Sequence, residues 1–85
     1  MSKKIKQDIS IGQNLKALRM KNNFTQDQVA AKLQTQGLLA SREIVSQMES
    51  GKYSIRMSVL LALKELYQAS FDDFFKDISL TANHA

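Results

Sequence analysis

The sequence predicts an all-α domain built from five short helices around one core. The chain has no proline and three glycines, and no stretch alternates apolar and polar residues between turn dipeptides, as β-strands do. Apolar residues instead recur three and four positions apart, mostly behind a Ser or Thr that can cap a helix. Helices this short do not persist alone, and 85 residues with 44% hydrophobic content supply one shared core.

The first two helices each begin with a capping-box pattern, a Ser or Thr followed three residues later by Gln. The pairs are Ser10 with Gln13 and Thr25 with Gln28. Suitable stops are Asn22-Asn23 for the first helix and Gly37 for the second. The apolar positions at helical spacing are Ile11, Leu15 and Leu18, followed by Val29, Ala30 and Leu33.

Three further helices are expected over 41–50, from about 56 to 67, and from residue 70 onward. Ser41 and Ser70 can cap the first and last of these, and Gly51 can end the first. Asp72 and Asp73 suit the positive end of the last helix. Their apolar positions are Val45 and Met48, then Val59, Leu60, Leu63, Leu66 and Tyr67, and finally Phe71, Phe74 and Phe75.

The composition excludes several kinds of chemistry. There is no cysteine, and the one histidine is His84, so disulfides, thiolate nucleophiles, Ser–His pairs and multi-histidine metal sites are not expected. No apolar run approaches the ~18–20 residues that span a bilayer, and the basic start lacks an apolar stretch behind it. We expect a cytoplasmic, non-enzymatic protein without a metal or cofactor.

The net charge of +4 is unevenly distributed. Residues 1–24 carry six basic side chains against Asp8, whereas residues 70–85 carry three aspartates against Lys76. A basic first part and an acidic last part suggest that one end of the domain faces a polyanion. An uneven solvated surface explains the same asymmetry.

The pair of short helices over 25–36 and 41–50, flanked by supporting helices, has the outline of a helix-turn-helix unit. Four short motifs lie in order along the chain: Ile11-Gly12-x-x-Leu15-Lys16-x-Leu18-Arg19, Phe24-Thr25-Gln26-x-x-Val29-Ala30, Ser41-Arg42-x-x-Val45-Ser46-x-Met48-Glu49-x-Gly51-Lys52, and Ser70-Phe71-Asp72-Asp73-Phe74-Phe75. Together they resemble the lambda-repressor/Cro-type, or xenobiotic-response-element-type, helix-turn-helix family. The resemblance covers about 65 of the 85 residues and implies a five-helix DNA-binding fold.

One departure from this family lies between its second and third helices. The family usually has about three residues between the last apolar residue of helix two and the cap of helix three, whereas Leu33 and Ser41 are eight positions apart here. The additional residues lengthen either helix two or the turn, which leaves the docking angle of helix three open.

The resemblance assigns base reading to the outward side of the third helix. With Val45 and Met48 inward, the positions that face outward together are Arg42, Glu43, Ser46 and Gln47. Arginine can pair with guanine, glutamine with adenine and glutamate with cytosine, although Glu43 can instead orient Arg42 or Lys52. An ordinary solvated helix face is the alternative. Ile44 fits either a thymine methyl group or the core, and the core is favoured.

Phosphate contacts are expected at two helix ends. The residues are Thr25 and Gln26 at the start of helix two, and Ser50, Gly51, Lys52 and Arg56 around the end of helix three, where the resemblance implies a clamp of backbone amides. Arg19 and Glu49 match a structural ion pair of the family; the alternative for Arg19 is a free phosphate contact. Lys3, Lys4 and Lys6 form a basic arm that either follows the DNA or is a frayed terminus.

The C-terminal end is rich in apolar residues, and we expect a homodimer interface there. Its residues are Phe71, Phe74, Phe75, Ile78 and Leu80. The alternative is a monomer that buries all three phenylalanines. We expect an arm over 1–9, a helix-turn-helix domain over 10–76 and a tail over 77–85. The expected function is a transcriptional repressor that binds double-stranded DNA at a pseudo-palindromic operator as a dimer. The alternative is an antitoxin-like or adaptor protein that binds a protein partner through its C-terminal end.

Overall fold

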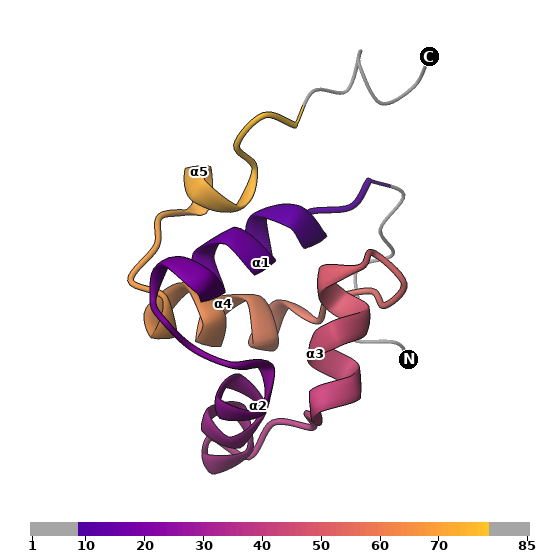
Figure 1. The fold of residues 1–85 in the computed structure, drawn as a ribbon, viewed down its shortest axis with the longest axis vertical. Coiled ribbons are helices and arrows are strands. Elements are labelled where there is room, and N and C mark those ends of the chain that lie inside the picture. Colours follow the sequence, from indigo (N-terminus) through magenta and orange to yellow (C-terminus); the bar gives the residue numbers. More distant parts are fainter. Residues whose placement is uncertain (1–8, 79–85) are drawn as a thin grey trace.

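The computed structural model describes residues 9–78, which form five helices arranged around a shared core (Figure 1). The helices are α1 (Gly12–Lys21), α2 (Gln26–Thr35), α3 (Arg42–Glu49), α4 (Met57–Leu66) and α5 (Phe71–Phe74). No β-strand occurs in this part of the chain, so the predicted all-α class is confirmed. Within 9–78, no helix is long and apolar enough to cross a membrane.

Three of the four predicted serine or threonine caps are present. Thr25 Oγ1 accepts the Gln28 amide at 3.1 Å while the Thr25 amide donates to Gln28 Oε1 at 2.8 Å, which completes a capping box. Ser41 Oγ accepts the Ile44 amide at 3.1 Å. Ser70 forms a second capping box with Asp73. These bonds satisfy amides that have no partner inside their helix, so they fix where the helices begin.

The predicted capping box of Ser10 and Gln13 is wrong. The N-cap of α1 is Ile11, which makes no side-chain capping bond, and Ser10 Oγ instead accepts the Gly12 amide at 3.0 Å. Ile11 is buried in the core. Burial of this side chain places the helix start one residue later than the local pattern indicates, and Ser10 is left outside the cap position.

The helices end where Asn and Gly residues were expected. Asn22 is the C-cap of α1 and is followed by Asn23 with φ 60°. Gly37 and Gly51 follow the ends of α2 and α3 with φ 78° and 80°. Glycine adopts this left-handed conformation without a steric cost because it has no Cβ atom. Gly37 and Gly51 therefore end their helices without backbone strain.

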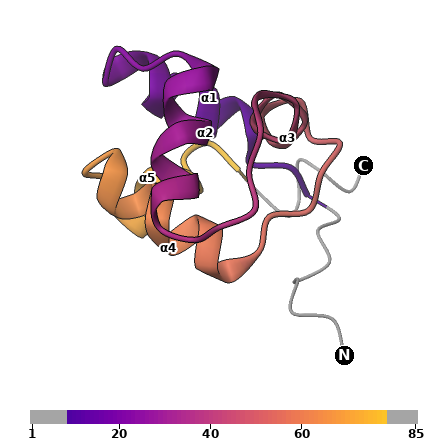
Figure 2. The ribbon, with the colours of Figure 1, turned by 90° about the horizontal axis from the view of Figure 1, so that it is seen from below.

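The core receives apolar side chains from all five helices. Helices α1 and α2 both pack on α3, and α1 also packs on α5. Figures 1 and 2 show that α2 and α3 cross one another, while α5 and the link between α2 and α3 lie at opposite ends of the domain. The fully buried large side chains are Phe74, Leu15, Leu33, Leu63, Val29 and Val45.

Candidate nucleic-acid interface

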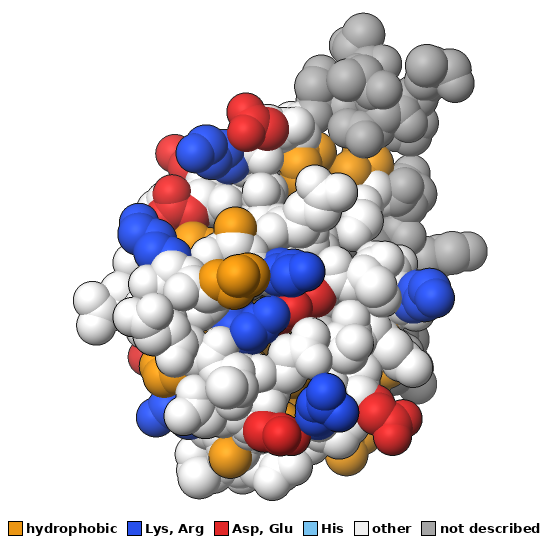
Figure 3. All heavy atoms as spheres, viewed as in Figure 1, with side chains coloured by type: hydrophobic (Ala, Val, Ile, Leu, Met, Phe, Trp, Pro, Cys, Tyr) orange, Lys and Arg blue, Asp and Glu red, His pale blue; other side chains and the backbone are white. Residues whose placement is uncertain are grey.

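Helix α3 has a buried side and an exposed side. Val45, Met48 and Glu49 are buried. The four predicted base-reading side chains are all exposed and lie together along the other side: Arg42, Glu43, Ser46 and Gln47. In Figure 3, the surface over α3 is mainly white, the colour of the backbone and of side chains that are neither hydrophobic nor charged, with a few charged side chains among them. Ile44 is half-buried against the core, as the favoured alternative proposed.

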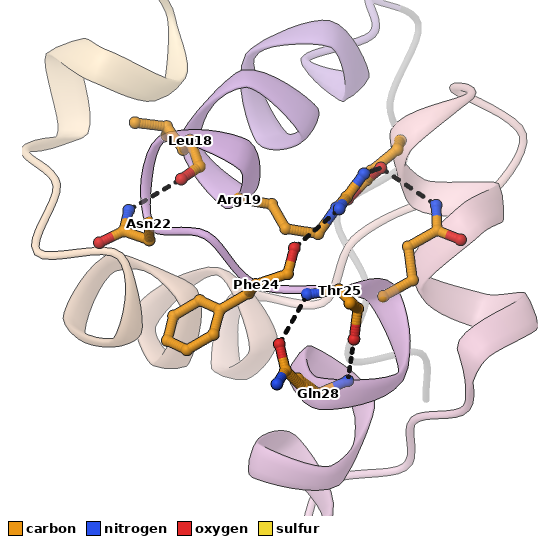
Figure 4. A network of polar contacts seen from close by, with 8 residues as sticks. Leu18, Arg19, Asn22, Phe24, Thr25 and Gln28 are labelled. Carbon is orange, nitrogen blue, oxygen red and sulfur yellow. Dashed lines mark hydrogen bonds and ion pairs between the residues drawn. The ribbon is translucent and has the colours of Figure 1, made fainter.

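An ion pair attaches the buried side of α3 to α1. Arg19 Nε donates to Glu49 Oε2 at 2.7 Å and Arg19 Nη2 donates to Glu49 Oε1 at 3.2 Å, with 12% and 5% of the two side chains exposed. Arg19 Nη1 donates to the Phe24 carbonyl at 2.9 Å (Figure 4). The expected ion pair is therefore present, and Arg19 is not a free phosphate contact. Its hydrogen bond to Glu49 raises the pKa of the Arg19 guanidinium, against a smaller opposing effect of burial.

Gln26, at the start of α2, joins the same network. Its Nε2 donates to Glu49 Oε1 at 3.2 Å, so one carboxylate receives bonds from both α1 and α2. Sequence reasoning placed Gln26 only at a phosphate, because no local pattern connects positions 26 and 49. A side-chain amide nitrogen has two hydrogens, so Nε2 of Gln26 has a second N–H that can be donated to another acceptor.

Gly12 brings the start of α1 against the backbone at the end of α3. A Cβ atom at this position would lie 2.3 Å from the Glu49 carbonyl oxygen and 2.8 Å from that of Met48. Both neighbours are backbone atoms, which cannot rotate away as a flexible side chain can. Glycine is therefore required for this approach of α1 to α3, a role that sequence analysis did not assign.

The start of α2 presents two backbone amides for an anion. The amide of Thr25 and its Oγ1 are both used in the capping box with Gln28. The other first-turn amides, those of Gln26 and Asp27, have no partner within residues 9–78. Free amides at the positive end of a helix favour phosphate. The backbone groups available to an anion here are therefore the amides of Gln26 and Asp27, and not the amide of Thr25. The Thr25 hydroxyl group can still donate its proton.

The expected clamp of backbone amides after α3 is not supported. The amides of Ser50, Gly51 and Lys52 already donate to the carbonyls of Ser46, Met48 and Gln47. Ser50 Oγ also donates to the Gln47 carbonyl at 3.1 Å. These bonds complete the C-terminal turn of the helix and satisfy its last carbonyl groups. The three amides are therefore not available to a phosphate. The predicted phosphate contacts that remain available here are the exposed, positively charged side chains of Lys52 and Arg56.

The additional residues between helices two and three enter the turn and do not extend α2. Helix α2 ends at Thr35 and α3 begins at Arg42. The link is braced, because Gln34 Nε2 donates to the Ala40 carbonyl at 2.6 Å and the Leu38 amide donates to the Leu33 carbonyl at 3.1 Å. Despite its length, the turn therefore has a defined path.

A family model described as a helix-turn-helix domain matches residues 10–74. The chain belongs to this helix-turn-helix family. Its members are regulators of the xenobiotic-response-element-like type, so the chain carries a DNA-binding domain of a kind that is typically non-enzymatic. Comparison with curated proteins and with solved structures gives no significant match.

The C-terminal end of the helix-turn-helix domain buries only part of the predicted dimer surface. Phe74 is fully buried in the core, so it is not available to a second chain, whereas Phe71 and Phe75 are 46% and 50% exposed. Ile78 is half-buried. Leu80 lies outside the described residues, as does the predicted arm of Lys3, Lys4 and Lys6.

An asparagine holds this end in place. Asn14 Nδ2 in α1 donates to the carbonyls of Phe74 and Lys76 at 2.8 and 2.9 Å. No local pattern predicts this contact, since a single polar residue on a helix does not indicate its partner.

Proposed function

We propose that this helix-turn-helix domain is a sequence-specific transcriptional repressor that places α3 in the major groove of double-stranded DNA. The observation that carries the proposal is the division of α3 into two sides. Four exposed polar or charged side chains lie on one side, and the other side is fixed by the core and by Glu49. A rigidly held helix with unpaired polar groups outward suits recognition of base edges.

Each exposed side chain of α3 has a chemical partner in the groove. Arg42 suits guanine through two parallel hydrogen bonds, and Gln47 suits adenine. Glu43 accepts from cytosine N4 or orients a neighbouring cation, and Ser46 donates or accepts. Phosphates on one side meet the first amides of α2 and the Gln26 side chain. On the other side they meet Lys52 and Arg56.

We further propose that the repressor binds a pseudo-palindromic operator as a homodimer. One module of this size contacts few base pairs, and two recognition helices about one DNA turn (~34 Å) apart solve that problem. The exposed Phe71 and Phe75 and the half-buried Ile78 support a contact at the α5 end. That end carries Asp72 and Asp73, and negative charge there favours an orientation away from phosphate.

Selection of bound sequences from random DNA tests the function, followed by binding of variants to the selected site. Arg42→Ala and Gln47→Ala should each cost about 1–3 kcal/mol on that site, with little loss on unrelated DNA. Lys52→Ala should weaken binding to every sequence and reduce the salt slope by about one unit. Lys21→Ala, which removes an exposed cation from the last turn of α1, is the matched control and should leave the slope unchanged. If all substitutions weakened all sequences alike, the base-reading assignment would be wrong.

Sedimentation at micromolar concentration tests the dimer separately. Phe71→Ala with Phe75→Ala should lower dimer affinity and operator binding while the domain stays folded. Leu61→Ala, which removes an exposed apolar side chain from α4, should change neither. A full-length chain that is monomeric both free and on its selected DNA would contradict the dimer. Capture of a different protein through Phe71 and Phe75, with no operator selected, would support the adaptor alternative.

A further inference from the structure

The turn between α2 and α3 exposes a leucine beside the recognition helix. Leu39 is 72% exposed, more than any other large apolar side chain of residues 9–78. Its neighbours are directed the other way, since Leu38 packs partly against the core and Ala40 is buried. In an extended segment, alternate side chains point to opposite sides, so burial of both neighbours places Leu39 outward.

The position of Leu39 is fixed by the polar contacts of the turn. On one side, the Leu38 amide is bonded to the Leu33 carbonyl at 3.1 Å; on the other, the Ala40 carbonyl accepts from Gln34 Nε2 at 2.6 Å. Ser41 then caps α3. A leucine held between two hydrogen-bonded residues has lost part of its backbone freedom before any ligand arrives, which lowers the entropic cost of a contact made by its side chain.

Leu39 also lies on the side of α3 that faces the start of α4. It borders a shallow hollow together with Ile44, Tyr53 and Arg56. Arg56 is one of the proposed phosphate contacts, and Leu39 precedes Arg42, the first proposed base contact, by three residues. The exposed leucine therefore borders one proposed phosphate contact, Arg56, and it lies in the link that leads into the N-terminal end of α3 (Figure 1).

We propose that Leu39 packs on the 5-methyl group of a thymine in the major groove, at the edge of the proposed DNA surface where the link enters α3. The thymine methyl group is the apolar feature of major-groove base edges, and it is the group that an aliphatic side chain recognises. A leucine makes no hydrogen bond to a phosphate or a polar base edge. This inference rests on the proposed function and adds one base preference to it, outside the four positions of α3.

Replacement of single thymines by deoxyuridine in the selected operator tests the proposal, because it removes the methyl group and retains the hydrogen-bonding groups of the base. Wild-type protein should lose roughly fourfold in affinity at one thymine of the half-site, which corresponds to ~0.8 kcal/mol for one buried methyl group. Leu39→Ala should bind the thymine site more weakly and should bind thymine and deoxyuridine sites equally. Leu61→Ala is the control for loss of an exposed leucine and should retain the wild-type discrimination.

The remaining outcomes distinguish failure of the Leu39 contact from failure of the proposed repressor function. A selected operator whose affinity is indifferent to deoxyuridine at every position would overturn the role of Leu39 and leave the repressor intact. Equal weakening of thymine and deoxyuridine sites by Leu39→Ala would also overturn it, since the side chain would then act through the shape of the turn. Failure to select any operator would overturn the proposed function itself. Unchanged thermal unfolding of Leu39→Ala verifies that the fold is intact.

Discussion

Helices α3 and α5 begin alike and are held differently. Each starts after a serine whose Oγ accepts an amide three residues on. Helix α3 is then fixed by directional contacts, with Glu49 bonded to Arg19 and Gln26 and with Gly12 against its backbone. Helix α5 is a single turn that buries one side chain, Phe74, and its Phe74 carbonyl accepts one hydrogen bond from Asn14, which also donates to the Lys76 carbonyl beyond the helix.

The difference shows what each kind of contact determines. Burial of an apolar ring stabilises a helix in place but is compatible with several rotations about its axis, because the hydrophobic effect is not directional. Hydrogen bonds to a fixed carboxylate are directional, so they set the rotation of α3 and thereby the side that it exposes. Helix α3 therefore has directional contacts from two other helices, whereas α5 has one, from Asn14.

The largest expected effect concerns the buried side chain of α5. Phe74→Ala should lower the free energy of unfolding by about 3–5 kcal/mol, because it removes a fully buried aromatic ring from the core. Urea denaturation measures the loss. Phe71→Ala is the control on the same helix and should cost only about 1 kcal/mol in the monomer, since Phe71 is half exposed and its ring contacts Lys64. Similar losses of stability for the two variants would contradict the assignment of Phe74 to the core and Phe71 to the surface.

The next effect tests the ion pair behind α3. Arg19→Ala and Glu49→Ala should each cost about 3 kcal/mol, because each leaves a partly buried charge without its partner. The double variant should be less damaged than the two single losses together. A double-mutant cycle on urea denaturation checks this prediction, and purely additive losses would mean that the pair is not coupled in solution.

A smaller effect is expected where α1 meets α3. Gly12→Ala should cost about 1–3 kcal/mol, as overpacked core substitutions do, because its Cβ would displace the backbone of Glu49. Displacement of α3 should also weaken binding to the selected operator, measured at a temperature where the variant is folded. Gln13→Ala, an exposed neighbour on α1, should alter neither quantity. Normal operator affinity in Gly12→Ala would show that this contact does not set the position of α3.

The smallest effect is at the cap of α5. The hydrogen bond from the Ser70 amide lowers the pKa of the Asp73 carboxyl below its ordinary value of 3.8. A lowered folded-state pKa gives a stabilising contribution that is full above 3.8 and is lost as the pH falls through the lowered value.

Asp73→Ala should therefore be less stable than wild type at about pH 5, and the difference should shrink as the pH falls below the ordinary carboxyl pKa. Thermal unfolding at a series of pH values measures this. Asp72→Ala removes the same charge from the neighbouring position and is the control. A difference for Asp73→Ala that does not change with pH would contradict the assigned bond.

Local sequence signals predicted the helices because capping and termination depend on residues three or four positions apart. Thr25, Ser41 and Ser70 cap their helices, and Gly51 ends α3 with a positive φ. Ser10 shows the limit of such signals. Its pattern with Gln13 is complete, yet burial of Ile11 decides where α1 begins.

Contacts between distant residues were predicted only where a family resemblance supplied them. Arg19 and Glu49 were paired in this way. The bonds of Gln26 to Glu49 and of Asn14 to the Phe74 carbonyl were not, because nothing in the local sequence indicates the partner of a polar side chain. Likewise, apolar spacing grouped three phenylalanines on one side of α5, but only packing against α1 determines that Phe74 is the buried one.

The division of α3 has a consequence for how this domain can change over time. The residues that fix the helix in the fold are Val45, Met48 and Glu49, whereas the exposed side chains are carried by other positions of the same eight residues. Exposed substitutions usually alter stability by less than about 0.5 kcal/mol. If α3 reads DNA as proposed, a new target sequence can be acquired by exchanging Arg42, Glu43, Ser46 and Gln47 while the scaffold is retained. The base preference of such a domain can then change through substitutions that hardly alter its free energy of unfolding.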